Sequence, residues 1–309
     1  MKFRTEINPA PSPFEINLTQ DQMFVGSCFS EHMSSRLSDL AMEITANPHG
    51  ILFNPVSVVH SLTDLIEKKV YSEKDLDEVE GKFVSFMHHG SFSGSDKAEV
   101  LERINKSIKN GRAVLGKAQT LFITLGSAWA YRHIEKNKFV ANCHKVPQKE
   151  FDKELISHDR AALVLQVALE KLFKLNENLQ VVFTVSPVRH WKDGFAENQL
   201  SKSHLTILAH KLSEAFEQVH YFPAYELVMD DLRDYRFFES DLLHPNKQAQ
   251  DYIWEKFQTV FFSASDREKI VKIENINRSL AHKPTEEKDE DFQNWRRKLI
   301  AQKAELLSK

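Results

Sequence analysis

Two apolar runs constrain the fold of this chain most strongly, at residues 121–125 (LFITL) and 181–185 (VVFTV). Such near-continuous runs are typical of strands in a parallel sheet whose two faces are both covered by helices. Segments with the 3.6-residue period of amphipathic helices follow at about 159–175 and 197–218. Because strands that alternate with helices form right-handed βαβ units, the pattern predicts an α/β fold with a parallel sheet.

Shorter apolar stretches at residues 23–25, 43–45 and 219–222 bring the expected sheet to about five strands. A chain of 309 residues with 41% hydrophobic residues can bury a sizeable core. We therefore expect one domain over residues 1–262. Residues 263–309 are rich in charge, most of all at 283–291, and predict a largely helical C-terminal extension.

The charge balance argues against a polyanionic partner. The 41 Lys and Arg residues against 44 Asp and Glu residues give a formal net charge of -3, so we expect neither a nucleic-acid nor a membrane partner. No apolar run reaches the ~20 residues of a membrane-spanning helix. Only two cysteines, Cys28 and Cys143, and a start without a signal peptide predict a cytoplasmic protein without disulfides. Glycine-rich phosphate loops are absent, so no cofactor is expected, and the oligomeric state is left open.

The first strand ends at Gly26 and is followed by Ser27 and Cys28, after which a segment of helical period begins. This places both nucleophilic side chains at the carboxyl end of a strand and at the N-terminus of a helix. Helix N-terminal amides lack intrahelical partners and carry partial positive charge, which lowers the pKa of a thiol. The sequence predicts that Cys28 ionises easily. The alternative to a catalytic role is that the residues of this turn are small only because the backbone is crowded there.

Asp241 precedes His244 by three residues, just before a helical segment. At this spacing the carboxylate can hold one imidazole nitrogen while the other nitrogen faces a nucleophile. The alternative, equally open, is that Asp241 caps the helix. The run 233–237 (RDYRF) predicts a buried ion-pair network that fixes the last loop, and the alternative is contact with the substrate.

Further polar residues lie in loops that could line a pocket. Gly50 and Asn54 belong to the loop at 47–55, and a polar, aromatic insertion at 83–93 contains adjacent histidines. Neighbouring residues rarely point the same way, so we expect hydrogen bonding there and no metal. Cys143 is expected to pack as a small apolar residue. The candidate ligand-binding residues are His88, His89, Ser91, Asn142, His144, Arg189 and His190.

The chain resembles the GSCFA family, whose name motif stands here as GSCFS at residues 26–30, with Ser30 in place of alanine. The resemblance covers about residues 5–262. It extends to residues 50–55, 88–93, 125–129, 142–147, 184–194 and 221–244. That family is similar in turn to the SGNH, or GDSL-like, hydrolases. The resemblance implies a three-layer α/β/α sandwich with a flavodoxin-like sheet in the order 2-1-3-4-5.

In the Gly-Asp-Ser block of those hydrolases the third residue is the nucleophile, and Cys28 stands there, with Ser27 as the competing nucleophile. Asp241 and His244 match their closing Asp-x-x-His block. Their Gly-x-Asn-Asp block corresponds best to residues 126–129, where Ala128 replaces the oxyanion-binding asparagine.

The resemblance therefore implies a hydrolase or acyltransferase that acts on an ester or thioester, including carbohydrate-linked acyl groups. Its oxyanion donors would be the amide of Cys28 with that of Gly50 or Gly126, or the side chain of Asn54 or Asn142. The missing asparagine motivates an alternative, a non-catalytic ligand-binding protein on the same fold. Its pocket would be formed by His88, His89, Asn142, His144, Arg189 and His190. Nothing in their spacing suggests that Cys28 and Cys143 form a redox pair.

Overall fold

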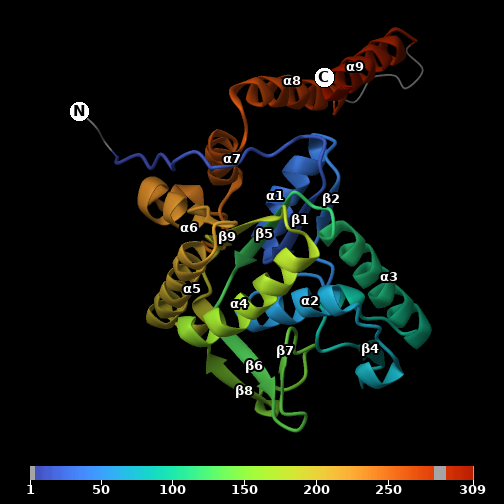
Figure 1. Ribbon diagram of the computed structural model, residues 1–309, viewed down its shortest axis with the longest axis vertical. Coiled ribbons are helices and arrows are strands. Elements are labelled where there is room, and N and C mark those ends of the chain that lie inside the picture. The colour runs from blue at the N-terminus through green and yellow to red at the C-terminus, as the bar shows by residue number, and fades with distance from the viewer. Residues whose placement is uncertain (1–3, 282–289, 309) are drawn as a thin grey trace.

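A computed structural model describes residues 4–281 and 290–308 and is organised around a parallel sheet. Its strands are β1 (Gln22–Gly26), β2 (Ile44–Ala46), β5 (Thr120–Leu125), β9 (Gln180–Val185) and β10 (Val219–Tyr221). Their order is β10-β9-β5-β1-β2, and all four neighbouring pairs are parallel (Figure 1). Counted along the chain, this is the order 2-1-3-4-5. The predicted fold class is therefore confirmed.

Successive side chains of each strand point to opposite faces of the sheet, so each strand supplies both cores. Met23 and Val25 pack with one group of helices, whereas Phe24 packs with another. The first group covers one face and consists of α2 (Pro55–Glu67), α3 (Lys97–Leu115), α4 (His158–Leu175) and α5 (Phe195–Ala215). Side-chain caps from Asn54, Asp96 and Ser157 begin the first three of these helices.

The opposite face is covered by a second layer of helices. It comprises α1 (Cys28–Asp39), α7 (Lys247–Phe261) and the short α6 (Ala224–Glu226) with the π-helical segment Leu227–Leu232 that follows it. Residues of α8 (Ala264–Leu280) pack against this layer from outside. Stacked aromatic rings fill this core, among them Phe24 on Phe122 at 4.6 Å between ring centroids. The result is the predicted three-layer α/β/α sandwich.

Two small antiparallel sheets are inserted into the sandwich. β3 (Asp77–Val79) and β4 (Lys82–Val84) form a hairpin that the sequence did not predict. β6 (Trp129–His133) and β7 (Lys138–Val140) form a second antiparallel hairpin. A third strand, β8 (Phe151–Leu155), extends it to the order β7-β6-β8.

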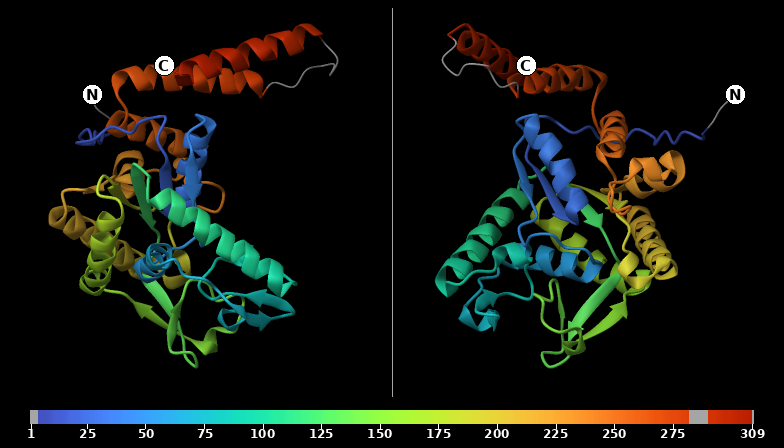
Figure 2. Two further views of the ribbon diagram at one scale, coloured as in Figure 1. Left: turned by 45° about the vertical axis from the view of Figure 1, so that its right-hand side comes forward. Right: turned by 180° about the vertical axis from the view of Figure 1, so that it is seen from behind.

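The C-terminal segment projects from the sandwich on the side away from β6, β7 and β8 (Figure 2). The predicted boundary at residue 262 falls between α7 and α8, and α9 (Glu290–Ser308) packs along α8. Ile270 and Ile273 of α8 belong to the same core as α7. The charge-rich residues 283–289 lie outside the described residues. None of the helices within the described ranges is long and apolar enough to cross a membrane.

Candidate active site

The turn after β1 requires its glycine. Gly26 adopts φ +142°, and a Cβ there would lie 2.2 Å from the carbonyl oxygen of Thr124 on β5. The Gly26 amide donates to Asn47 Oδ1 at 2.9 Å, and its carbonyl accepts from Leu52 at 2.9 Å. The residues that follow are thereby held at the carboxyl edge of the sheet, between β2 and β5, where ligands enter doubly wound sheets.

Cys28 is the first residue of α1 and is partly buried. Burial and the carboxylate of Glu31 raise the pKa of its thiol, whereas amides of Phe29 and Cys28 and the cation of Lys202 lower it. The net shift is upward. The prediction of an easily ionised thiol is therefore wrong, because removal from water outweighs the helix N-terminus. The upward shift favours the protonated thiol at neutral pH.

Ser27 occupies the N-cap position of α1 and is 1% exposed. Its Oγ has no hydrogen-bond partner among the residues that the structure describes. A serine hydroxyl becomes a nucleophile when an adjacent base accepts its proton. Ser27 therefore lacks the contact that would activate it here.

Asp241 and His244 form a pair in the loop before α7. The Asp241 Oδ2 atom lies 2.6 Å from His244 Nδ1, and Oδ1 accepts the amides of Leu243 and His244 at 2.8 and 3.0 Å. The side chain that caps α7 is Asn246 instead, which accepts the amide of Ala249. Hydrogen bonds from His244 and from the loop amides lower the pKa of Asp241 to about 2. The carboxylate therefore directs Nδ1–H of the imidazole and leaves Nε2 as the acceptor.

The loop that holds this pair is fixed by Arg189, which follows β9. Its guanidinium donates to the Leu242 carbonyl at 3.1 Å, and its backbone amide donates to the Leu243 carbonyl at 3.4 Å. Leu242 adopts φ +60°, a strained conformation for a branched side chain. Arg189 therefore holds the loop in place. The donors that it uses for the Leu242 and Leu243 carbonyls are not available to a ligand.

The guanidinium of Arg189 also lies over the rings of Trp191, Tyr235 and Phe238, at 5.0 to 5.3 Å from their centroids. Tyr235 is 59% exposed, and the neighbouring ion pair of Arg236 with Asp234 is at the surface. The prediction of a buried ion-pair network at residues 233–237 is therefore wrong, since Tyr235 and the charged side chains of this run are exposed.

The loop that precedes α7 lies beside α1, because Glu239 of this loop lines a pocket together with Phe29 and His32. His244 lowers the pKa of His32, which lies four residues after Cys28 and so on the same face of α1. It also lowers the pKa of His190, which burial and Lys202 bring down to about 4. A pocket of about 480 Å³ opens beside this face. It is lined by Phe29, His32 and Arg36 of α1 and by Glu239, Lys247 and Gln250.

Lys202 of α5 belongs to the same site and was missed by the sequence analysis. It is 1% exposed, and its Nζ donates to the carbonyls of Gly126 and Ser186, both at 2.7 Å. Burial lowers the pKa of Lys202 to about 7, although the charge interaction with Cys28 acts to raise it. A signal was present, because Lys202 lies on the face of the helix that continues with the buried Leu205, Leu208 and Leu212.

The glycine amides expected to hold an oxyanion are already engaged. The Gly50 amide donates to Asn47 at 2.7 Å and the Gly126 amide donates to Phe53 at 2.8 Å, both to carbonyl oxygens. Ala128 is fully buried, and its amide donates to Ser201 Oγ at 2.8 Å. The prediction for Gly50 and Gly126 is therefore contradicted in this structure, because neither amide is free.

The side-chain alternatives use only their oxygen atoms in the hydrogen bonds of the loops. Asn54 Oδ1 accepts the amide of Ser57 at 2.9 Å and caps α2, and Asn142 Oδ1 accepts the amide of His144 at 2.8 Å. Their Nδ2 groups are the atoms that could donate to an oxyanion, so Asn54 and Asn142 stay predictions beside the amides in the first turn of α1.

A model of the GSCFA family matches residues 22–257. The chain belongs to this family. The match includes the turn at Cys28, the buried Lys202 and the pair of Asp241 with His244. A search of curated proteins finds no match.

In this GSCFA protein the other predicted ligand residues form a second group. His88 Nδ1 lies 2.9 Å from Ser85 Oγ, and His144 Nε2 lies 2.8 Å from the Ser85 carbonyl oxygen. His89 accepts from the amide of Ser91 and lies against Gly50. The hydrogen bonds within the described chain link this group internally, and none of them joins it to Cys28 or His244.

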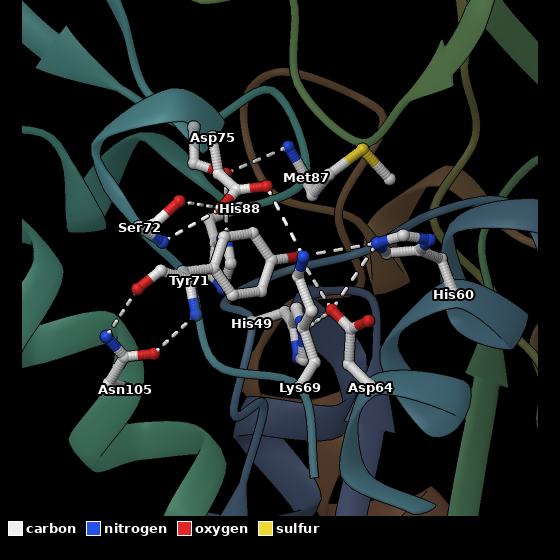
Figure 3. A network of polar contacts seen from close by, with 11 residues as sticks. His49, His60, Asp64, Lys69, Tyr71, Ser72, Asp75, Met87, His88 and Asn105 are labelled. Atoms are coloured by element: carbon white, nitrogen blue, oxygen red, sulfur yellow. Dashed lines mark hydrogen bonds and ion pairs between the residues drawn. The ribbon is translucent and has the colours of Figure 1, made fainter. Parts of the chain in front are cut away.

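His88 is not a free ligand-binding side chain. It is fully buried and stacks on His49, with ring centroids 4.5 Å apart and planes at 13° (Figure 3). His49 lies 3.0 Å from Asp64 and 2.8 Å from Ser61 Oγ, so its Nε2–H donates to the carboxylate and its Nδ1 accepts the hydroxyl proton. Tyr71 donates to the same Asp64 oxygen at 2.6 Å. This Asp64 network supports the loop at 47–54 that wraps around the end of β1.

The described residues contain no group of three or more His, Cys, Asp and Glu side chains that could hold a metal ion. His88 and His89 in particular point to different partners, because one stacks on His49 and the other bonds to Ser91.

Substitution of Asp64 by alanine is expected to lower the free energy of unfolding by about 3–5 kcal/mol, because it leaves buried donors on His49 and Tyr71 without an acceptor. Urea unfolding at pH 7 measures this. The matched control is Glu67→Ala on the same helix, where a surface ion pair with Lys171 is lost and about 1 kcal/mol or less is expected. Equal effects of the two substitutions would show that the Asp64 network does not stabilise the fold.

The protein is expected to lose stability as the pH falls below about 6.5. Burial lowers the pKa of His49, His88, His144 and His190, the last from 6.5 to about 4. Between pH 6.5 and about pH 4 the unfolded chain binds protons that the folded chain does not. The stability that these neutral histidines contribute above pH 6.5 is therefore lost on acidification. His190 alone accounts for about 2 kcal/mol of this loss at pH 5. Unfolding curves at pH 7.5 and pH 5 test this, and unchanged midpoints would contradict it.

Proposed function

We propose that this protein is a hydrolase or acyltransferase that acts on an ester or thioester, with Cys28 as its nucleophile. The observation that carries the proposal is the Asp241–His244 contact of 2.6 Å on a loop that lines a pocket together with Phe29 and His32 of α1. A carboxylate that directs an imidazole toward a nucleophile is the arrangement used for covalent acyl transfer on several unrelated folds.

In the proposed reaction His244 Nε2 accepts the proton of Cys28 while Sγ attacks the acyl carbon. The tetrahedral intermediate collapses to a thioester on Cys28, and the leaving alcohol or thiol takes the proton from His244. Water, or an acceptor alcohol or thiol, then attacks the thioester with His244 again as base, and the thiol is restored. Asp241 stays ionised and stabilises the imidazolium. The raised pKa of Cys28 makes this base necessary.

The negative charge on the intermediate needs donors, and the first-turn amides of α1 fill that role in the proposal. They lie at the positive end of the helix dipole, and the amides of Cys28 and Phe29 act to lower the pKa of the Cys28 thiol. The pocket lined by Phe29 and His32 would hold the acyl or leaving group. The resemblance to SGNH-like hydrolases extends the proposed substrates to carbohydrate-linked acyl groups.

The family's likeness to soluble hydrolases and the two free cysteines agree with a cytoplasmic protein that acts on small molecules without a nucleic-acid or membrane partner, and we include this in the proposal. The alternative is a binding protein that holds its ligand without turnover. It is favoured by the engaged amides of Gly50 and Gly126 and by the buried alanine at position 128.

Turnover of activated acyl compounds separates the two functions. The purified protein is mixed with p-nitrophenyl acetate, p-nitrophenyl butyrate and acetyl thioesters, and product release is followed against buffer alone. The proposal expects saturable release at catalytic protein concentration. Release no faster than in buffer, together with a raised melting temperature in the presence of the same compounds, would establish the binding protein instead.

A further inference from the structure

Lys202 is the most unusual charged side chain of the described chain. It projects from α5 into the interior, where the Gly126 and Ser186 carbonyl oxygens accept from its Nζ at 2.7 Å. These two residues directly follow β5 and β9, so a single side chain connects the carboxyl ends of both strands. Gly126 in turn abuts Ser27, because a Cβ added to it would lie 3.4 Å from Ser27 Cβ.

Such a position is costly for an ammonium group. Lys202 is 1% exposed, and its hydrogen bonds within the described residues go to carbonyl oxygens and not to a carboxylate. An isolated charge in the interior is strongly destabilising unless it is paired, and a methionine of similar length would avoid that penalty. The lysine therefore points to a role that an apolar side chain cannot perform.

The titratable groups around Lys202 show where its charge acts. Cys28 of α1 raises the pKa of Lys202, and Lys202 lowers that of Cys28 and of His190 after β9. The carboxylate of Glu31 has the opposite effect to Lys202, because it raises the pKa of Cys28. On the remaining side the ring of Tyr225 lies 5.7 Å from Nζ. Cys28 is thus the group around Lys202 that can become its counter-ion.

We propose that Lys202 is a positioning residue that ties the ends of β5 and β9 to the turn at Ser27 and stabilises the negative charge on Cys28 when its proton leaves. This inference rests on the proposed role of Cys28 as a nucleophile. Because an ammonium has three N–H donors and two are used by the carbonyls, the group stays fixed while its charge acts on the thiolate. His244 remains the proton acceptor.

Two substitutions separate the charge from the tether. Lys202→Gln removes the charge but keeps an amide with two N–H donors for the two carbonyls, whereas Lys202→Met removes both. The readout is the rate of Cys28 alkylation by iodoacetamide between pH 6 and pH 10, followed by mass spectrometry of the Cys28 peptide. We expect alkylation at pH 7.5 to be about tenfold slower in both variants, with each profile moved to higher pH.

A Lys202→Gln profile that superimposes on that of wild type would overturn the proposal and leave Lys202 as a tether only. Thermal unfolding shows whether both variants fold. If they do not, the titration of lysine ¹³Cε NMR signals in wild type and Cys28→Asp gives the answer with Lys202 in place. The signal that titrates near pH 7 is expected to move to higher pH when a carboxylate replaces the neutral thiol, and an unmoved signal contradicts the proposal.

These readouts use no substrate. A protein that turns over no ester or thioester but shows the Lys202 effect on alkylation would refute the proposed function and retain the thiolate–ammonium pair. Turnover of an ester or thioester without the Lys202 effect on alkylation would support the proposed function and refute the thiolate–ammonium pair.

Discussion

Replacement of Cys28 by alanine is expected to reduce turnover of an activated ester or thioester by about a thousandfold or more, to the level that binding and polar donors alone can supply. The reason is that no covalent intermediate can form without the thiol. Initial rates with p-nitrophenyl acetate, measured over equal ranges of protein concentration, give the comparison. This is the largest effect that the proposed mechanism predicts.

The matched control is Cys143→Ala. Cys143 is the other free thiol and packs with Phe86, Val140 and Phe151 in a small apolar cluster between β7 and the insertion. Its loss should leave turnover unchanged. If Cys143→Ala and Cys28→Ala lose activity equally, the nucleophile has been misassigned. Full activity in Cys28→Ala with loss in Ser27→Ala would transfer the role to Ser27.

Removal of the His244 imidazole is expected to slow turnover by about 10²- to 10⁴-fold, the usual contribution of a general base. The effect should depend on pH, because the thiol of Cys28 is protonated at neutral pH and His244 accepts its proton. Wild type and His244→Ala should therefore differ most near pH 7 and converge at a pH above the raised thiol pKa. Rate profiles between pH 6 and pH 10 measure both features.

The control for this substitution is His210→Ala, which removes an exposed histidine of α5 that contacts Tyr221. It should follow the wild-type profile throughout. Asp241→Asn should behave like a weaker form of His244→Ala, because the imidazole loses the acceptor for its Nδ1–H. A constant ratio of wild-type to His244→Ala rates at every pH would mean that His244 does not act as the base.

The sheet was predictable because its strands carry their own signal. Residues 121–125 and 181–185 are apolar on both faces, and both faces are in fact covered by helices. The strand β8 lacked such a signal, since its sequence FDKEL alternates little and its Asp152 and Lys153 are exposed. The three-residue strands β3 and β4 were too short to show a period.

The site was predictable where chemistry follows local spacing and was missed where it depends on tertiary neighbours. The contact of Asp241 with His244 follows from their separation of three residues. The raised pKa of Cys28 and the engagement of the Gly126 amide depend on segments distant in the sequence. Lys202 was overlooked because a lysine in an amphipathic helix normally faces solvent.

The most direct test of the central claim is to trap the acyl-enzyme. The protein is mixed with excess p-nitrophenyl acetate, quenched in acid at short times and digested for peptide mass spectrometry. The account predicts one acetyl group on the peptide that contains Cys28, formed more slowly in His244→Ala and absent from Cys28→Ala. Turnover without any acetyl group on Cys28, or with the acetyl group on Ser27, would contradict it.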